Sequence, residues 1–229
     1  MQVIVLADGD VGPLEALDAA WPAWLQAGAR VVAADGGARH APGLGLRIDR
    51  WVGDGDSLGE AGIAALVAAG IPVERARPDK DESDTELAVV AALAFEPTQL
   101  AIVGALGGPR FDHALANVGL LALPGLRDID VRLIGIDARV RLIQAPRPDG
   151  SMGTAELAGP VGDGVSLLPV GDDVMGVTTV GLAYPLDDET LSVGRTRGLS
   201  NVRVDGSRAS IQVRSGRLLV VETPATLTR

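Results

Sequence analysis

The stretch WVGDGDSLGEAGIAALVAAGIPVERARPDKDESDTE, residues 51–86, decides the fold that we predict for this chain. It opens with an apolar run and then places two carboxylates, Asp54 and Asp56, among glycines. After an alanine-rich segment of helical character, it ends in a second acidic segment that contains Lys80, the only lysine of the chain. Apolar runs that end in polar, glycine-bearing segments are typical of parallel strands, whose carboxyl ends carry the ligand site in α/β sheets. The stretch therefore predicts an α/β fold with a site at one edge of its sheet.

Outward from this stretch, apolar runs alternate with segments of helical periodicity as far as residue 141. Strands are predicted at residues 3–7, 30–34, 50–53, 71–75, 100–106 and 131–136, and helices at residues 13–27, 59–69, 83–95 and 113–123, with a break or second start at Pro22. Such alternation implies right-handed crossovers and a mostly parallel sheet covered by helices on both faces. Because parallel strands end at the same edge of a sheet, we expect Asp35, Asp54 and Gly107 to converge there.

The C-terminal part of the chain has a different texture. Residues 145–151, APRPDGS, have the composition of a linker. Beyond them, short β-type runs are predicted at residues 164–170, 174–181, 191–194, 209–213 and 218–222, with glycine, proline and aspartate between them. This spacing is typical of an antiparallel sandwich or barrel. We therefore predict two domains, an α/β domain over residues 1–143 and an antiparallel β domain over residues 144–229.

Composition argues against several classes of protein. The chain has 229 residues, a formal net charge of -10, no cysteine and a mean hydropathy of +0.25. The negative charge argues against a nucleic acid partner, and no apolar run is long enough to cross a membrane. A chain without cysteine forms no disulfide and no thiolate metal site, which fits a cytoplasmic protein.

The acidic residues of the opening stretch suit a metal ion. Asp54 and Asp56 are separated by one glycine, and two carboxylates this close repel each other unless a cation lies between them. Asp81 and Asp84 flank the start of a predicted helix beside Lys80. Oxygen ligands of this kind suit Mg2+, which usually binds through one or two carboxylates together with substrate phosphates. The stretch therefore predicts a Mg2+-dependent enzyme that handles the phosphates of a nucleotide.

Each motif also has a purely structural explanation. Residues 53–57 have the composition of an ordinary turn. Ser83 and Glu86 form a capping-box pattern, whatever else their segment does. Asp112 and His113 also suit the cap and the exposed first turn of a helix. Other phosphate-binding motifs are absent, since the sequence has neither the Gly-Lys-Ser or Gly-Lys-Thr of a P-loop nor a dinucleotide fingerprint.

Taken together, the motifs resemble one family, the thiamine pyrophosphokinases. The resemblance extends over most of the chain and rests on ADGG (34–37), GDGDS (53–57), KDESDTE (80–86), GGPRFDHALAN (107–117), GLAYPL (181–186) and GLSN (198–201). It implies an α/β domain followed by a β-sandwich, in a homodimer. It also implies transfer of the pyrophosphoryl group of ATP to the hydroxyl group of thiamine, giving thiamine diphosphate and AMP.

The resemblance further implies roles for individual residues. Asp54, Asp56 and Asp84 correspond to Mg2+ ligands. Lys80 and Asp81 complete the catalytic group, with Asp81 as a candidate proton acceptor. ATP and its phosphates are expected at a second set of residues, namely Asp35, Gly36, Ser57, Arg110, Asp112 and His113.

In the β domain, the resemblance implies that thiamine binds at Ser200 and Asn201. Three residues depart from the family pattern: Gly55 stands where phenylalanine is frequent, Ser83 replaces threonine, and Pro109 is an insertion. Two other functions stay open from the residues alone. One is a non-catalytic module that binds a metal ion or a nucleotide, and the other is a Mg2+-dependent nucleotide phosphohydrolase.

Overall fold

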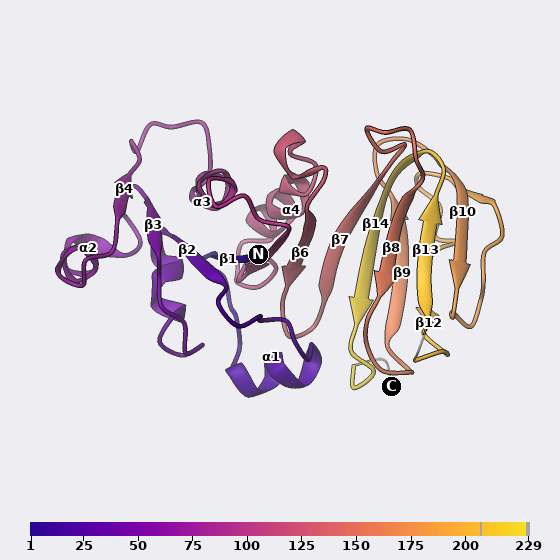
Figure 1. Ribbon diagram of the computed structural model, residues 1–229, viewed down its shortest axis with the longest axis horizontal. Coiled ribbons are helices and arrows are strands. Elements are labelled where there is room, and N and C mark those ends of the chain that lie inside the picture. The colour runs from indigo at the N-terminus through magenta and orange to yellow at the C-terminus, as the bar shows by residue number, and fades with distance from the viewer. Residues whose placement is uncertain (207, 228–229) are drawn as a thin grey trace. The chain divides into compact units, whose positions relative to one another are not determined.

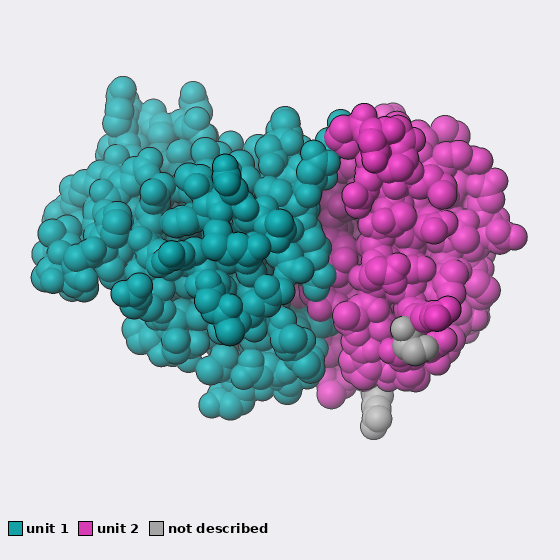
Figure 2. Space-filling model, viewed as in Figure 1, with its two compact units in different colours: residues 1–136 teal, residues 137–229 magenta. Residues whose placement is uncertain are grey.

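The chain divides into two compact units, Met1–Ile136 and Asp137–Arg229, which Figure 2 shows in different colours. The structure is a computed structural model, and it describes residues 1–206 and 208–227. Residues 207, 228 and 229, which the predicted second domain includes, lie outside the described residues. Among the residues that are described, no helix is long and apolar enough to cross a membrane.

The first unit contains a parallel sheet. Its strands are β1 (Gln2–Leu6), β2 (Arg30–Ala34), β3 (Arg50–Gly53), β4 (Val73–Arg75), β5 (Gln99–Val103) and β6 (Asp130–Ile134). They lie in the order β6-β5-β1-β2-β3-β4, and each neighbouring pair is parallel, as predicted. The chain runs outward from β1 to β4 and then returns to place β5 on the other side of β1. The carboxyl ends of β1 and β5 therefore form a topological switch point, where α/β sheets usually bind ligands.

Helices cover both faces of this sheet. They are α1 (Leu14–Ala20), α2 (Gly59–Ala68), α3 (Asp84–Leu93) and α4 (Phe111–Leu120), with 3-10 helices η1 (Asp35–His40) and η2 (Pro124–Leu126). Figure 1 shows α1 on one face and α3 and α4 on the other. Alternate residues of β1 explain this arrangement, because Ile4 and Leu6 are buried in one core cluster with Leu17 of α1 and with Trp21.

The helix predicted over residues 13–27 is the main error in the first unit. Helix α1 ends at Ala20 and is capped by Trp21. Pro22 has no N–H group with which to continue the helix, and Ala23 has a positive φ of 64°. The predicted break at Pro22 is therefore confirmed, but the second half of this segment is irregular rather than helical.

The second unit is an antiparallel β-sandwich, which confirms the predicted fold class. One sheet has the order β12 (Asn201–Val202), β9 (Gly164–Pro169), β14 (Gly216–Thr223) and β7 (Arg139–Ala145). The other has the order β11 (Glu189–Leu191), β10 (Val174–Val180), β13 (Ala209–Val213) and β8 (Gly153–Leu157). Buried residues of both sheets, such as Leu218 of β14 and Ile211 of β13, belong to one core cluster.

The second unit differs from expectation in three respects. Strands β7, β8 and β12 were not predicted, and the segment predicted as a linker, residues 145–151, is the last residue of β7 followed by the loop between β7 and β8. The compact units divide at 136/137, whereas the predicted domain boundary is at 143/144, inside β7; this strand goes with the second unit because it pairs with β14 over residues 139–145. The strand predicted at residues 191–194 is β11, which ends at Leu191.

Candidate active site

Asp35, which directly follows β2, is the first residue of the site. Its side chain is 2% exposed and its backbone is left-handed, with a φ of 38°. Its carboxylate accepts hydrogen bonds from the backbone N–H groups of Ser57 (2.9 Å) and Leu58 (3.2 Å), in the segment that follows β3. The next residue, Gly36, has no room for a side chain, because a Cβ there would collide with the Asp8 carboxylate. The ends of β1, β2 and β3 are thus packed together at this point.

Lys80 brings two further carboxylates together. Its Nζ lies 2.6 Å from Oδ2 of Asp54, which follows β3, and 3.1 Å from Oδ1 of Asp84, the first residue of α3. The position of Asp84 is fixed by a helix cap, in which the Ser83 hydroxyl accepts a hydrogen bond of 3.1 Å from the N–H group of Glu86. The predicted capping role of Ser83 is therefore confirmed, and it places Asp84 within reach of Lys80.

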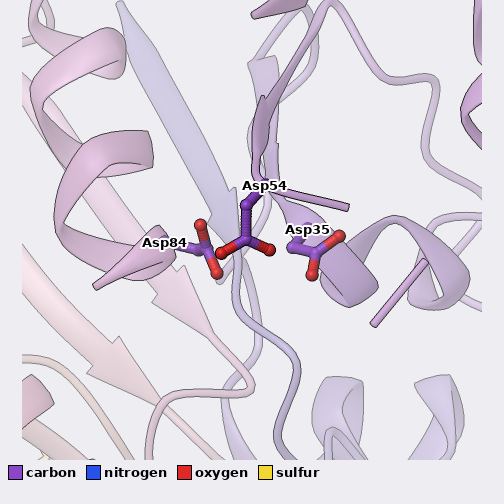
Figure 3. Close-up of side chains that lie close together, drawn as sticks. All are labelled: Asp35, Asp54 and Asp84. Carbon is purple, nitrogen blue, oxygen red and sulfur yellow. The ribbon is translucent and has the colours of Figure 1, made fainter. Parts of the chain in front are cut away.

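Asp35, Asp54 and Asp84 form one carboxylate cluster, with one oxygen atom of each within 4.8 Å of the others. Figure 3 shows the three side chains directed toward one another from three separate segments of the first unit. The structure thus brings Asp35 into the set where Asp56 was predicted. Asp56 lies beside this cluster, since it interacts with the carboxyls of Asp35 and Asp54. The predicted Mg2+ ligation by Asp54, Asp56 and Asp84 remains a prediction.

The charges of the cluster suit a hard divalent cation. Burial raises the pKa of the Asp35 and Asp84 carboxyls, and the hydrogen bond from Lys80 lowers the pKa of Asp54. Burial opposes the charge of Lys80, but its bonds to Asp54 and Asp84 outweigh this effect and raise the pKa of its ammonium group. One ammonium group therefore faces three carboxylates, which leaves negative charge for a second cation to neutralise. Carboxylate oxygens alone make up the donor set, as Mg2+ prefers.

A cavity of about 480 Å³ opens beside this cluster at the carboxyl ends of the strands. Several predicted residues line it, namely Asp35, Asp56, Ser57, Lys80, Asp84, Arg110 and His113. Segments after β1 and β5 line it too, including Gly9, Gly104 and Gly107. This confirms that the segments at Asp35 and Gly107 converge, and it places the cavity at the switch point of the sheet.

Four predicted site residues of the first unit do not line the cavity: Asp54, whose carboxylate is paired with Lys80, and also Gly36, Asp81 and Asp112. Gly36 is covered by Asp8, Asp81 is exposed, and Asp112 is turned to Arg110. Arg110 donates to both carboxylate oxygens of Asp112, at 2.9 Å from Nε and 2.6 Å from Nη2, and this pairing lowers the pKa of Asp112. The N-cap residue of α4 is Arg110, and no side chain caps the helix there. The structural role suggested for Asp112, that of a helix cap, is therefore wrong.

Asp8 and Arg39 were missed by the sequence analysis. Asp8 follows β1 and lines the cavity, and its Oδ1 accepts a hydrogen bond of 2.6 Å from Nη2 of Arg39. Arg39 also donates from Nη1 to the carbonyl oxygen of Ser57, at 2.8 Å. The signal for Asp8 was present, because it follows its strand in the same way that Asp35 and Asp54 follow theirs.

The structure gives a physical reason for the glycine at position 55. Its φ is 89°, and a Cβ at this position would lie 2.5 Å from Cδ1 of Ile63 and 3.9 Å from Cη2 of Trp51. The space beside the loop is therefore already filled by Ile63 and Trp51. This explains how the loop is packed with a glycine at position 55.

Of the residues predicted for thiamine, Ser200 lies in the turn before β12 and Asn201 is the first residue of β12. Ser200 has a φ of 57°, and its N–H group donates to Oγ of Ser166 at 3.1 Å. The Asn201 side chain is buried, and its amide group makes two hydrogen bonds to the backbone of Tyr184. Oδ1 of Asn201 accepts from the N–H group of Tyr184 at 3.0 Å, and Nδ2 of Asn201 donates to the carbonyl oxygen of Tyr184 at 2.7 Å. The side chain of Tyr184 itself is exposed (65%).

Comparison with known families decides the relationship. The model described as "Thiamin pyrophosphokinase, catalytic domain" matches residues 22–133, and the model described as "Thiamin pyrophosphokinase, vitamin B1 binding domain" matches residues 155–218. The chain belongs to the thiamine pyrophosphokinase family. It is therefore an enzyme, and its family is one of transferases. The first match contains Asp35, the acidic stretch and Arg110, and the second contains Ser200 and Asn201.

Individual members of the family are distant but extensive matches. Thiamine pyrophosphokinase of Bacillus subtilis is 27% identical over 171 residues, which cover 75% of this chain and 76% of that protein. The crystal structure of thiamine pyrophosphokinase from Bacillus subtilis has a TM-score of 0.81 at 24% identity and covers 98% of this chain and 99% of its own. That from Geobacillus thermodenitrificans has a TM-score of 0.80 at 24% identity over 100% of both chains. These structures agree with the fold described above.

Proposed function

We propose that this chain transfers the pyrophosphoryl group of ATP to the hydroxyl group of thiamine in a Mg2+-dependent reaction, giving thiamine diphosphate and AMP. One observation carries the proposal. Lys80 and the carboxylate cluster lie together beside a cavity at the switch point of a parallel sheet, in a chain of the thiamine pyrophosphokinase family. Phosphoryl transfer depends mainly on such positioned charges.

The residues of the cavity have complementary roles in this proposal. Asp35, Asp54 and Asp84 would hold Mg2+, with Asp56 beside them, and a bound Mg2+ supplies positive charge next to the phosphate oxygens. Lys80, which is paired with Asp54 and Asp84, would supply a second positive charge at the same place and would exchange these carboxylate partners for phosphate oxygens. Arg110 and His113 extend the lining toward the start of α4, where the guanidinium group of Arg110 adds a further positive charge. These groups suit a triphosphate, which the carboxylates alone would repel.

The bond changes balance without any further reactant. The hydroxyl oxygen of thiamine forms a bond to the β-phosphorus of ATP, while the bond from that phosphorus to the α,β-bridging oxygen breaks and AMP leaves with the electron pair. The hydroxyl proton passes to a carboxylate. Asp56 is exposed and lines the cavity, whereas Asp81 does not line it, so we favour Asp56 over Asp81 as the acceptor.

The second unit is proposed to bind thiamine through the turn at Ser200 and Asn201. The match of residues 155–218 to a vitamin B1 binding domain supports this role. Because both polar ends of the Asn201 amide are bonded to Tyr184, Asn201 would act by shaping the turn. We further propose a homodimer, and a place in the cytoplasm, on the basis of the family resemblance.

Product analysis tests the proposed reaction. The protein is incubated with ATP and Mg2+, with and without thiamine, and nucleotides are separated by chromatography. We expect AMP and thiamine diphosphate in equal amounts, formed only when thiamine is present. Formation of ADP would contradict pyrophosphoryl transfer. Release of phosphate or pyrophosphate without thiamine would identify a phosphohydrolase, and Mg2+ binding without any calorimetric signal from ATP or thiamine would identify a binding module.

A further inference from the structure

One buried side chain outside the carboxylate cluster contacts two of the segments that form it. Trp51, in β3, is 0% exposed, and its Nε1 donates a hydrogen bond of 2.9 Å to the carbonyl oxygen of Asp35. The far edge of the same ring faces the loop after β3, since a Cβ on Gly55 would lie 3.9 Å from Cη2 of Trp51. A single rigid indole thus lies against the segment of Asp35 and against the residue that separates Asp54 from Asp56.

The conformation of Asp35 is one that needs such support. A φ of 38° is unfavourable for a residue with a side chain and persists only where the surroundings impose it. The carboxylate of Asp35 is held by two N–H groups of the loop after β3, and its carbonyl group is held by Trp51 of β3 itself. Both polar ends of Asp35 are therefore fixed to the β3 segment, which also carries Asp54.

We propose that Trp51 is a positioning residue for the divalent cation. Its N–H group keeps Asp35 in the left-handed conformation that directs the Asp35 carboxylate toward Asp54 and Asp84. The inference rests on the proposed metal site. It assigns to Trp51 a role in metal binding in addition to its packing in the hydrophobic core. Mutation of a residue that orients a metal ligand commonly weakens metal binding about 10- to 100-fold.

Trp21 offers a matched control within the same unit. Its side chain is 1% exposed, it belongs to the same core cluster as Trp51, and its Nε1 donates a hydrogen bond of 2.7 Å to the carbonyl oxygen of Gly135. Trp21→Phe and Trp51→Phe therefore remove the same kind of group and the same kind of bond. The hydrogen bond that Trp51→Phe removes is to Asp35, a residue of the carboxylate cluster, whereas the bond from Nε1 of Trp21 is to Gly135.

The test measures metal binding by the protein without nucleotide. Mn2+ replaces Mg2+ as the probe, calorimetry gives its Kd, and circular dichroism confirms that each variant is folded at the temperature used. We expect Trp51→Phe to weaken Mn2+ binding about 10-fold, the lower end for partners of metal ligands, and Trp21→Phe to change it less than about twofold. Equal affinities for the wild type and Trp51→Phe would overturn the inference, and so would equal losses in both variants.

A second replacement separates the N–H group from the shape of the ring. Incorporation of 3-benzothienylalanine at position 51 keeps two fused rings and removes the donor, so it is suitable even if Trp51→Phe does not fold. We expect the same loss of Mn2+ affinity, and an unchanged Kd would overturn the assignment to the N–H group. If the wild type itself binds no Mn2+, the proposed metal site fails and takes this role of Trp51 with it. Failure of the variants alone leaves the proposed function intact.

Discussion

Nζ of Lys80 lies 2.6 Å from Oδ2 of Asp54, so the only lysine of the chain is paired with a carboxylate of the proposed metal site. We expect Lys80→Met to reduce turnover by at least about 100-fold, because charge that builds on the transferred group loses a fixed cation. Mn2+ binding by the nucleotide-free variant should not weaken, since the ammonium group competes with the metal ion for Asp54. AMP release and calorimetry measure the two effects.

Lys80→Arg is the control for charge. The guanidinium group keeps the positive charge but has a planar shape that an ammonium pocket does not fit, so we expect it to restore little of the activity. Full turnover in Lys80→Arg would show that any nearby cation suffices. Weakened Mn2+ binding in Lys80→Met would contradict the competition between the ammonium group and the metal ion.

A second prediction concerns the identity of the metal ligands. The structure clusters Asp84 with Asp35 and Asp54, and Asp56 lies beside them. We expect Asp84→Asn to weaken Mn2+ binding more than about 10-fold and Asp56→Asn to weaken it less, although both abolish turnover. Asp79 is 68% exposed and paired with Arg77, so Asp79→Asn is a matched control that should leave both properties unchanged. A larger loss of affinity in Asp56→Asn would restore Asp56 as the third ligand.

The site could be predicted from the sequence where its residues follow strands. Asp35 and Asp54 were found because each ends an apolar run, and the order of parallel strands then brings them together. Asp8 has the same signal but was not used. The bond from Trp51 to Asp35 could not be predicted, since an indole N–H group finds its partner only in the packed core.

The second unit shows how the pattern of polar residues in a sequence can hide a strand. Strand β7 was missed because Arg139 and Arg141 interrupt its apolar residues, and in the structure both arginine side chains are buried beside Glu222. A buried ion pair reads as a solvent-facing pattern in the sequence. The composition of residues 145–151 likewise describes a loop but does not tell whether the loop joins two domains or two strands.

A third prediction concerns the loop between Asp54 and Asp56. We expect Gly55→Ala to lower the free energy of unfolding by about 2–4 kcal/mol, because it adds left-handed strain and a collision with Ile63. Gly59 also has a positive φ, of 76°, but nothing lies within 4 Å of its added Cβ. Gly59→Ala should therefore cost about 1–2 kcal/mol from strain alone. Urea denaturation followed by circular dichroism measures both.

Ile63→Val tests the assumed collision, because it removes Cδ1. In the Gly55→Ala background it should cost less than it does in the wild type, so that the double variant is more stable than the two single losses predict. Strict additivity would show that the backbone conformation alone opposes a side chain at position 55.

A fourth prediction concerns the buried ion pair of the second unit. Glu222 accepts hydrogen bonds from Nε and Nη2 of Arg139 at 2.9 and 2.8 Å, and both side chains are at most 5% exposed. We expect Glu222→Gln to lower the free energy of unfolding by about 3–5 kcal/mol, because it leaves buried positive charge without its carboxylate. The exposed pair of Glu60 and Arg75 is the control, and Glu60→Gln should cost less than about 1 kcal/mol. Equal costs in urea denaturation would contradict this account.

A fifth prediction concerns the dependence of stability on pH. Burial raises the pKa of Asp163. The hydrogen bond from the N–H group of Ala225 and the charge of Arg203 lower this pKa, but burial outweighs them. Because the folded pKa lies above the unfolded value, the contribution of this group to stability is fully present below an ordinary aspartate pKa of about 3.9 and is lost as pH rises through the folded pKa. The free energy of unfolding of the wild type, relative to Asp163→Asn, should therefore decrease as pH rises from below about 3.9 and then become constant.

Asp149 provides a control of opposite sign in the same unit. Hydrogen bonds from the hydroxyl and N–H groups of Ser151 lower its pKa, so its contribution to stability is present above an ordinary aspartate pKa and is lost as pH falls through the folded pKa. The free energy of unfolding of the wild type relative to Asp149→Asn should thus increase with pH over the acidic range. Denaturation series at several pH values measure both slopes, and slopes of the same sign for Asp163 and Asp149 would contradict the assigned causes.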